Sequence, residues 1–113
     1  MKLVIAIIQP ERLPYVKEEL FKAEVRKMTV SRVKGCGQQM GYESAYRGKI
    51  HSVNLLDKIR IGIVVNEDFV EKTIDAIVKG ARTGNIGDGK IFVQSLDRCI
   101  RIRTGEEGSA AVG

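Results

Sequence analysis

The spacing of hydrophobic residues changes along the chain, and each spacing predicts one type of element. Residues 2–8 are nearly continuous valine, isoleucine and leucine, which predicts a buried strand. Over residues 11–23 the apolar positions recur at helical spacing, which predicts an amphipathic helix with Pro10 at its start. Alternation over residues 28–33 predicts a second strand that closes at Lys34 and Gly35. The first third of the chain therefore reads as strand, helix, strand.

The same order returns in the second half of the chain. Residues 59–65 predict a third strand, and Asn66 is a plausible N-cap for a helix that ends near Gly80. Residues 91–93 predict a short strand, and the alternation over residues 98–103 predicts a terminal one. The tail from Thr104 is rich in glycine and alanine, and we expect it to be mobile, above all over residues 105–113.

This order predicts an α+β, ferredoxin-like βαββαβ sandwich with a short C-terminal strand. With 113 residues, the chain is expected to form a single domain over residues 1–113. Both helices would cover one face of the sheet. The strands are too apolar for the other face to remain in water, so we expect other subunits to cover it.

The segment from about residue 37 to residue 55 interrupts this regular pattern. It contains glycines and polar residues without sustained periodicity. A loop of about 20 residues is unusual in a compact domain unless it has a function. Its length therefore marks it as a part of the molecule that carries function.

Composition narrows the classes of function. The net charge of +5 and a pI near 9.4 suit an anionic ligand or an acidic partner. Three Tyr, three Phe and no Trp, with none in an aromatic-basic motif, disfavour a nucleic-acid module, so phosphate-bearing small molecules are favoured. Cys36 and Cys99 indicate free thiols rather than a disulfide framework or zinc site. The apolar run at the N-terminus is too short for a membrane span, and we expect a cytoplasmic protein.

A glycine-rich run provides the first candidate for chemistry. Residues 84–90 satisfy the G-x-x-x-x-G-K part of a phosphate loop, whose backbone N–H groups and lysine bind phosphate. Ile91 stands where a Walker loop needs a Mg²⁺-binding hydroxyl, and a strand follows, so this is not a Walker loop. A simple turn explains the run equally well. Arg101 and Arg103 would lie on one face of the terminal strand and would repel each other unless an anion lies between them. This favours a clamp for a polyphosphate over a solvated edge strand.

With these residues in view, the chain resembles the PII family of nitrogen-regulatory signalling proteins. The similarity is strongest over residues 83–93 and 101–107 and extends to residues 28–30, 33–35 and 46–48. The resemblance implies a homotrimer without catalytic activity that binds ATP or ADP in clefts between subunits. It also implies a protein partner, such as an ammonium transporter, a nitrogenase system or an enzyme of nitrogen metabolism.

The resemblance also implies roles for individual residues. Nucleotide contacts are expected from Ile7, Thr29, Gly35, Gln38, Val64, Gly87, Asp88, Gly89, Lys90, Arg101 and Arg103, with the two arginines contributed across the cleft. Gln39 would complete a Mg²⁺ site when 2-oxoglutarate binds beside ATP, and Lys58 would pair with the distal carboxylate of the metabolite. The loop at about 37–55 would be the effector loop, with partner contacts from Tyr46, Arg47, Lys49 and His51.

The chain departs from the family pattern at several positions. His51 and Lys49 replace a tyrosine and a serine that relatives modify, so neither modification is expected in its usual form. Gln38 replaces a frequent arginine and Gly62 a frequent glutamate, so we expect weaker nucleotide binding or a less sharp distinction between ADP and ATP. A small phosphotransferase is the alternative function. This alternative is disfavoured because the chain lacks a hydroxyl to bind Mg²⁺ after Lys90 and has no evident Asp/His pair to act as a base.

Overall fold

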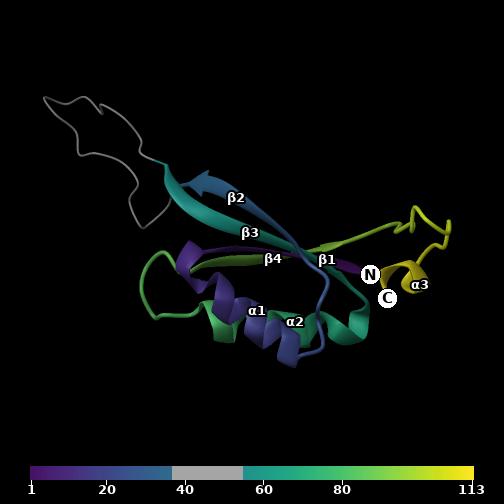
Figure 1. The fold of residues 1–113 in the computed structure, drawn as a ribbon, viewed down its shortest axis with the longest axis horizontal. Helices are drawn as coiled ribbons and strands as arrows, with labels where there is room; N and C mark the ends of the chain where they lie inside the picture. The colour runs from purple at the N-terminus through teal and green to yellow at the C-terminus, as the bar shows by residue number, and fades with distance from the viewer. Residues whose placement is uncertain (37–54) are drawn as a thin grey trace, which may run out of the picture.

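The computed structural model describes residues 1–36 and 55–113 (Figure 1). The sheet and the two long helices follow the predicted order. The strands are β1 (Lys2–Ile8), β2 (Thr29–Gly35), β3 (Leu56–Val65) and β4 (Gly89–Ser95). The helices are α1 (Leu13–Lys22), α2 (Val70–Ala81) and a short α3 (Ser109–Val112), with 3-10 turns η1 (Pro10–Arg12) and η2 (Glu67–Phe69) before the first two. None of the helices in the described part of the chain combines the length and apolarity needed to cross a bilayer.

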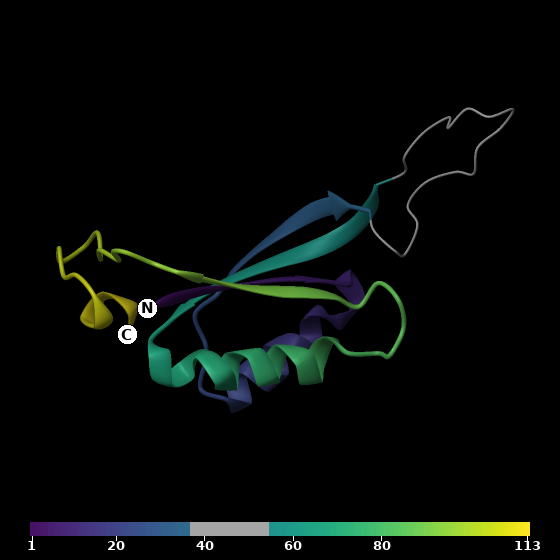
Figure 2. The ribbon, with the colours of Figure 1, turned by 180° about the vertical axis from the view of Figure 1, so that it is seen from behind.

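The four strands form one antiparallel sheet in the order β2-β3-β1-β4. Figures 1 and 2 show α1 and α2 side by side on one face of this sheet, with the other face uncovered by helices. The α+β sandwich predicted from the sequence is confirmed. β2 ends at Gly35 and β3 begins at Leu56, so the long segment between them connects two neighbouring strands of the sheet.

Alternation along the strands separates the core from the open face. Val4 and Ala6 in β1 and Ile61 in β3 are fully buried, because they point toward the helices. The intervening residues point to the open face, where Ile7 of β1 lies opposite Arg60 of β3 and Lys90 of β4. One sheet therefore supports a core on one side and a partly polar, partly apolar surface on the other.

The close approach of α1 and α2 fixes where the glycine-rich loop begins. A Cβ at Gly80 would lie 2.6 Å from the Cα of Val16, so only glycine allows the two helices this contact. Arg12 Nε donates a hydrogen bond of 2.9 Å to the carbonyl oxygen of Gly80. These contacts hold the C-terminal end of α2 against the start of α1, and the loop leaves from that point.

The predicted C-terminal strand is wrong. Residues 98–103 join no sheet strand, and only Ile100 forms an isolated bridge, to Glu107. The backbone N–H of Arg101 donates to the carbonyl of Glu106, and Gly105, with a φ of 75°, donates back to Arg101. The chain thus folds back on itself, because these local bonds satisfy the backbone groups that a sheet would have paired.

Two smaller features concern Asn66 and the tail. Asn66 occupies the N-cap position, but its side chain makes no cap hydrogen bond, and its amide donates to the carbonyl of Ser109 instead. The tail that we expected to be mobile contains the helical turn α3, and Lys27 Nζ donates to Gly113 at 2.7 Å. The tail therefore packs beside the start of η2, and α3 lies near the N-terminus (Figure 1).

Candidate functional site

A pocket of about 670 Å³ lies at the end of the sheet where β1 and β2 stop and β3 and β4 begin. Its volume falls within the range of small-molecule sites. Apolar side chains, two lysines and the glycine-rich loop contribute to its wall. The lining residues are Ile7, Gly35, Cys36, Leu56, Lys58, Asn85, Ile86, Gly87, Asp88, Gly89, Lys90 and Phe92.

The pocket reaches both ends of the long segment between β2 and β3. Gly35 and Cys36 precede this segment, and Leu56 and Lys58 follow it. In the register of the sheet, Gly35 is paired with Leu56. A ligand in this pocket would therefore contact the base of the segment from both sides.

Lys58 joins three parts of the pocket wall. Its side chain is largely buried, with 9% of the residue exposed. Its Nζ donates to Oε1 of Gln9 at 3.1 Å and to the carbonyl oxygen of Gly87 at 3.4 Å. Because Gln9 follows β1 and Gly87 belongs to the loop, Lys58 connects the start of β3 to both.

The glycine-rich loop is held close to the end of β1. Gly87 and Gly89 have φ values of 102° and 109°, which disfavour any other residue. A Cβ at Gly89 would lie 1.7 Å from the carbonyl oxygen of Ile7, so a side chain cannot be accommodated there. The loop backbone consequently lies directly on β1 and forms one wall of the pocket.

The Asp88 carboxylate is bonded within the same loop. Its Oδ2 accepts hydrogen bonds from the backbone N–H of Thr83 at 2.8 Å and of Gly84 at 2.9 Å, and Oδ1 accepts from the Thr83 hydroxyl. The hydroxyl of Thr83, then its backbone N–H and that of Gly84, and the charge of Arg12 lower the pKa of Asp88. Asp88 is therefore ionised at neutral pH and stabilises the loop.

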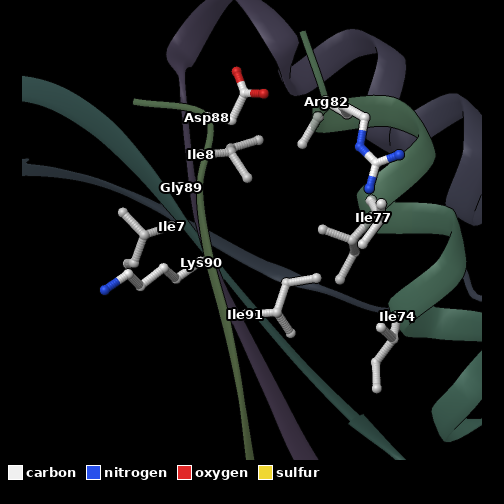
Figure 3. A pocket seen from close by; sticks show the side chains of 11 residues that line it. Ile7, Ile8, Ile74, Ile77, Arg82, Asp88, Gly89, Lys90 and Ile91 are labelled. Atoms are coloured by element: carbon white, nitrogen blue, oxygen red, sulfur yellow. The ribbon is translucent and has the colours of Figure 1, made fainter. Parts of the chain in front are cut away.

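β4 separates this pocket from a second cavity. Figure 3 shows Ile91 on the side of β4 that faces Ile74 and Ile77 of α2, and Lys90 on the side of Ile7. The cavity, about 400 Å³, lies between α2 and the start of β4, and isoleucines make up five of its eleven lining residues. The alternation of β4 thus directs Lys90 toward the pocket at the end of the sheet and Ile91 toward the core.

Seven of the predicted site residues line the pocket together: Ile7, Gly35, Lys58, Gly87, Asp88, Gly89 and Lys90. Thr29 and Val64 do not line it. They lie farther along the same open face, where Thr29 pairs with Gly62 and Val64 with Leu3. Gln38, Gln39, Tyr46, Arg47, Lys49 and His51 lie outside the described residues.

The segment after β4, which carries Arg101 and Arg103, lies at the opposite end of the sheet from the start of β4 (Figures 1 and 2). β4 has seven residues, which at about 3.3 Å each carry the chain about 20 Å from Gly89 before residue 96. The side chain of Arg101 donates to Glu106 Oε1 and to the carbonyls of Ala110 and Gly113. The prediction that both arginines share a strand face is wrong, since no strand forms there.

The sequence assigned no role in the site to Gln9, Cys36, Thr83 or Phe92. Phe92 and Lys90 share the open face because they are two residues apart on β4, a relation that the short predicted strand at residues 91–93 missed. Thr83 lies five residues before Asp88, and threonine and aspartate in one glycine-rich turn commonly bond each other's backbone. Gln9 carries no comparable pattern, and only its contact with Lys58 reveals it.

The fold and the pocket define a small α+β domain: a ferredoxin-like sandwich with a glycine loop and two lysines at the base of a long connection. The model of one family, described as Nitrogen regulatory protein P-II, matches residues 1–106. The chain therefore belongs to the P-II family of nitrogen regulatory proteins.

Individual relatives agree with this family over nearly the whole chain. Nitrogen regulatory protein GlnK1 of Methanosarcina mazei is 54% identical over 114 residues, covering 99% of this chain and 97% of the relative. Nitrogen regulatory protein P-II 2 of Methanothermobacter thermautotrophicus is 49% identical, with the same shares covered. Nitrogen regulatory protein P-II 1 of Escherichia coli is also 49% identical, over 99% of this chain and all of the relative.

Proposed function

We propose that this protein is a non-enzymatic sensor of nitrogen, carbon and energy status that binds ATP or ADP in the pocket at the end of the sheet. One observation carries the proposal. A single pocket is walled by the glycine loop and by both ends of the segment between β2 and β3. A ligand there is in a position to influence that segment directly.

The residues of the pocket fit a nucleotide. Lys58 and Lys90 supply positive charge, and the loop at Gly87 and Gly89 brings backbone close to the ligand without side chains in the way. Ile7, Ile86 and Phe92 provide apolar surface for a base or ribose. Phosphate at the loop and base on the open face is the arrangement that this distribution favours.

A metabolite site beside the phosphates is the second part of the proposal. Lys58 would pair with the distal carboxylate of 2-oxoglutarate, and Gln39 would contribute an oxygen to Mg²⁺. That ion prefers oxygen ligands and substrate phosphates. When bound, Mg²⁺ would neutralise phosphate charge and hold the keto acid beside ATP. The contact of Lys58 with Gly87 supports placing this site next to the phosphate loop.

A homotrimer would bring the remaining predicted residues to the pocket. Arg101 and Arg103 cannot join the pocket of their own chain, because the length of β4 lies between them. A neighbouring subunit can supply them across a cleft. The open sheet face, with Thr29 and Val64, would then become an interface between subunits, and the clefts would number three per trimer.

The output would pass through the effector loop at about residues 37–55. Ligands at its base would select among its conformations according to their differential affinity. The loop would contact a protein such as an ammonium transporter, a nitrogenase system or an enzyme of nitrogen metabolism. Tyr46 would anchor the contact, Arg47 and Lys49 would add charge, and His51 would lie on the surface. The protein would be cytoplasmic and recruited to the membrane by a transporter.

Calorimetric titration tests the ligand half of this function. ATP and ADP should each bind the purified protein, and 2-oxoglutarate should bind only when Mg²⁺ and ATP are present. Extended incubation with ATP should release little or no phosphate. Failure of both nucleotides to bind at millimolar concentration would refute the proposal.

A loop replacement tests the output half. A variant with residues 41–52 replaced by a short Gly-Ser link should still bind ATP, since the pocket residues of the described chain lie outside the replacement. It should no longer retain the partner that the intact protein captures under the same ligand conditions. Equal capture by both proteins would place the partner surface elsewhere.

A further inference from the structure

The most extensively bonded side chains of the glycine loop are Thr83 and Asp88. The Asp88 carboxylate accepts from the Thr83 hydroxyl and from the backbone N–H groups of Thr83 and Gly84. The Thr83 hydroxyl in turn accepts from the N–H of Asn85 at 3.2 Å. Asp88 N donates back to the carbonyl of Asn85 at 3.4 Å, which closes the turn. Residues 83–88 are thus linked into one closed hydrogen-bonded turn.

From this geometry we propose that Thr83 is a positioning residue for the nucleotide site, acting through Asp88. This inference rests on the proposed nucleotide function. Thr83 itself does not line the pocket, whereas Asp88 and the glycines on either side of it do. The Thr83–Asp88 contact therefore lies behind the pocket wall and supports it.

Electrostatics give the contact a second consequence. An ionised carboxylate beside two lysines would pair with them and repel the phosphate of a ligand. Both oxygens of Asp88 instead accept bonds from Thr83 and Gly84, on the side of the loop next to the end of α2. The Asp88 carboxylate is thus bonded within its own loop, on the side away from the pocket wall that it helps to form.

Backbone geometry explains why the loop needs such support. Gly84, Gly87 and Gly89 all have positive φ, and glycine loses more conformational freedom on ordering than any other residue. A loop with three such residues gains order from bonds to side chains. Without the Thr83–Asp88 contact, the loop would become ordered only when a nucleotide binds. The conformational entropy lost at that step would lower the affinity.

Two substitutions separate this role from simple packing. Thr83→Val keeps the shape of the side chain but removes the hydroxyl, and it should weaken ATP binding about tenfold, as for loss of a hydrogen bond to a charged group. Thr83→Ser retains the hydroxyl and should bind ATP within about threefold of the parent. Ser95→Ala is the matched control, because it removes an exposed hydroxyl bonded to Lys2 at the far end of β4.

The experiment combines calorimetry with ATP and amide hydrogen exchange of the ligand-free protein. Thr83→Val should speed exchange of the amides at residues 83–85 several-fold, Thr83→Ser should restore slow exchange, and Ser95→Ala should change neither exchange there nor affinity. Thermal unfolding midpoints of the Thr83 and Ser95 variants should remain close to that of the parent, because both side chains are exposed. Asp88→Asn should reproduce the exchange effect from the other side of the contact.

Each outcome decides one of the two claims. Unchanged exchange in Thr83→Val would overturn the Thr83–Asp88 contact as the source of loop order. Faster exchange with unchanged ATP affinity would overturn the positioning role while leaving the nucleotide function intact. A parent protein that fails to bind ATP would refute the nucleotide function and the positioning role with it, whatever the exchange data show about the loop.

Discussion

Nζ of Lys58 lies 3.4 Å from the carbonyl oxygen of Gly87, so β3 is bonded directly to the glycine loop near the point where β3 begins. The two residues come from β3 and from the turn before β4, which are not neighbours in the sheet. A ligand that draws Lys58 toward itself must alter this contact. Through this pair, an anion bound at the glycine loop can affect the base of the segment between β2 and β3.

Replacing Lys58 tests that route. Lys58→Met should abolish binding of 2-oxoglutarate in the presence of Mg²⁺ and ATP, because it removes the charge that would pair with the distal carboxylate. ATP alone should still bind. In the parent, 2-oxoglutarate and ATP should raise each other's affinity by the same factor, since coupling is reciprocal. Lys34→Met is the control, because Lys34 is exposed and pairs with Asp57 instead. Equal binding by Lys58→Met and parent would contradict the assignment.

The origin of the basic groups can be tested with mixed trimers. Lys90→Ala and Arg103→Ala should each weaken ATP binding about tenfold or more, because each removes a charged partner of the phosphates. When the two variants are refolded together, some clefts receive Lys90 from an Arg103→Ala chain and Arg103 from a neighbouring Lys90→Ala chain. These clefts should bind ATP strongly again. Native mass spectrometry can count ATP per mixed trimer. Absence of any restored site would show that both residues act within one subunit.

Assembly is the third prediction. The open sheet face and the side chain of Ile102, which is 100% exposed in the single chain, predict that chains associate. The family resemblance implies that three of them do so. Light scattering should give three times the chain mass of 12.5 kDa at micromolar concentration. Ile102→Ser should shift the equilibrium toward smaller species. A stable monomer of the parent protein would remove the basis for clefts between subunits.

Gly89 provides a stability prediction with an internal control. Gly89→Ala places a methyl group 1.7 Å from the carbonyl oxygen of Ile7 at a φ of 109°. We expect a loss of about 2 kcal/mol or more, because steric overlap adds to backbone strain. Gly84→Ala has a similar φ of 91° but nothing within 4 Å, so it should lose only about 1 kcal/mol. Equal losses in urea denaturation would contradict the close contact with β1.

The pH dependence of loop stability follows from Asp88. Hydrogen bonds from Thr83 lower the pKa of Asp88 in the folded protein below the ordinary value of 3.8. A lowered carboxyl pKa contributes stability above the unfolded pKa, and that contribution is lost as pH falls through the folded pKa. The stability difference between the parent and Asp88→Asn should therefore be full above about pH 5 and shrink toward pH 3. A constant difference across this range would rule out an ionised Asp88 as its source.

The strong periodic elements could be predicted from the sequence. β1 has the predicted bounds, residues 2–8, because every second residue is buried by the helices and the others remain apolar. α2 begins with a 3-10 turn and ends at Ala81, within a residue of the expected end near Gly80. The alternation over residues 98–103 led to the wrong prediction of a strand, because alternating arginine and isoleucine suit an edge strand and a folded-back turn equally well. Local bonds around Gly105 decided between them.

The candidate site divides in the same way. Gly87, Gly89 and Lys90 could be recognised in the sequence, since glycines and a lysine in one short run are a local pattern that needs no knowledge of the fold. The contacts of Lys58 with Gln9 and Gly87 join residues 49 and 29 positions apart, and no pattern in the chain indicates such pairs. The end-to-end separation of Arg101 from the pocket likewise follows from the direction of β4. The sequence by itself thus determined the four strands of the sheet, the two long helices and the glycine loop, because local spacing and backbone preference control them. Only the tertiary structure decided which charges meet at the pocket, because strand register and loop closure bring them together.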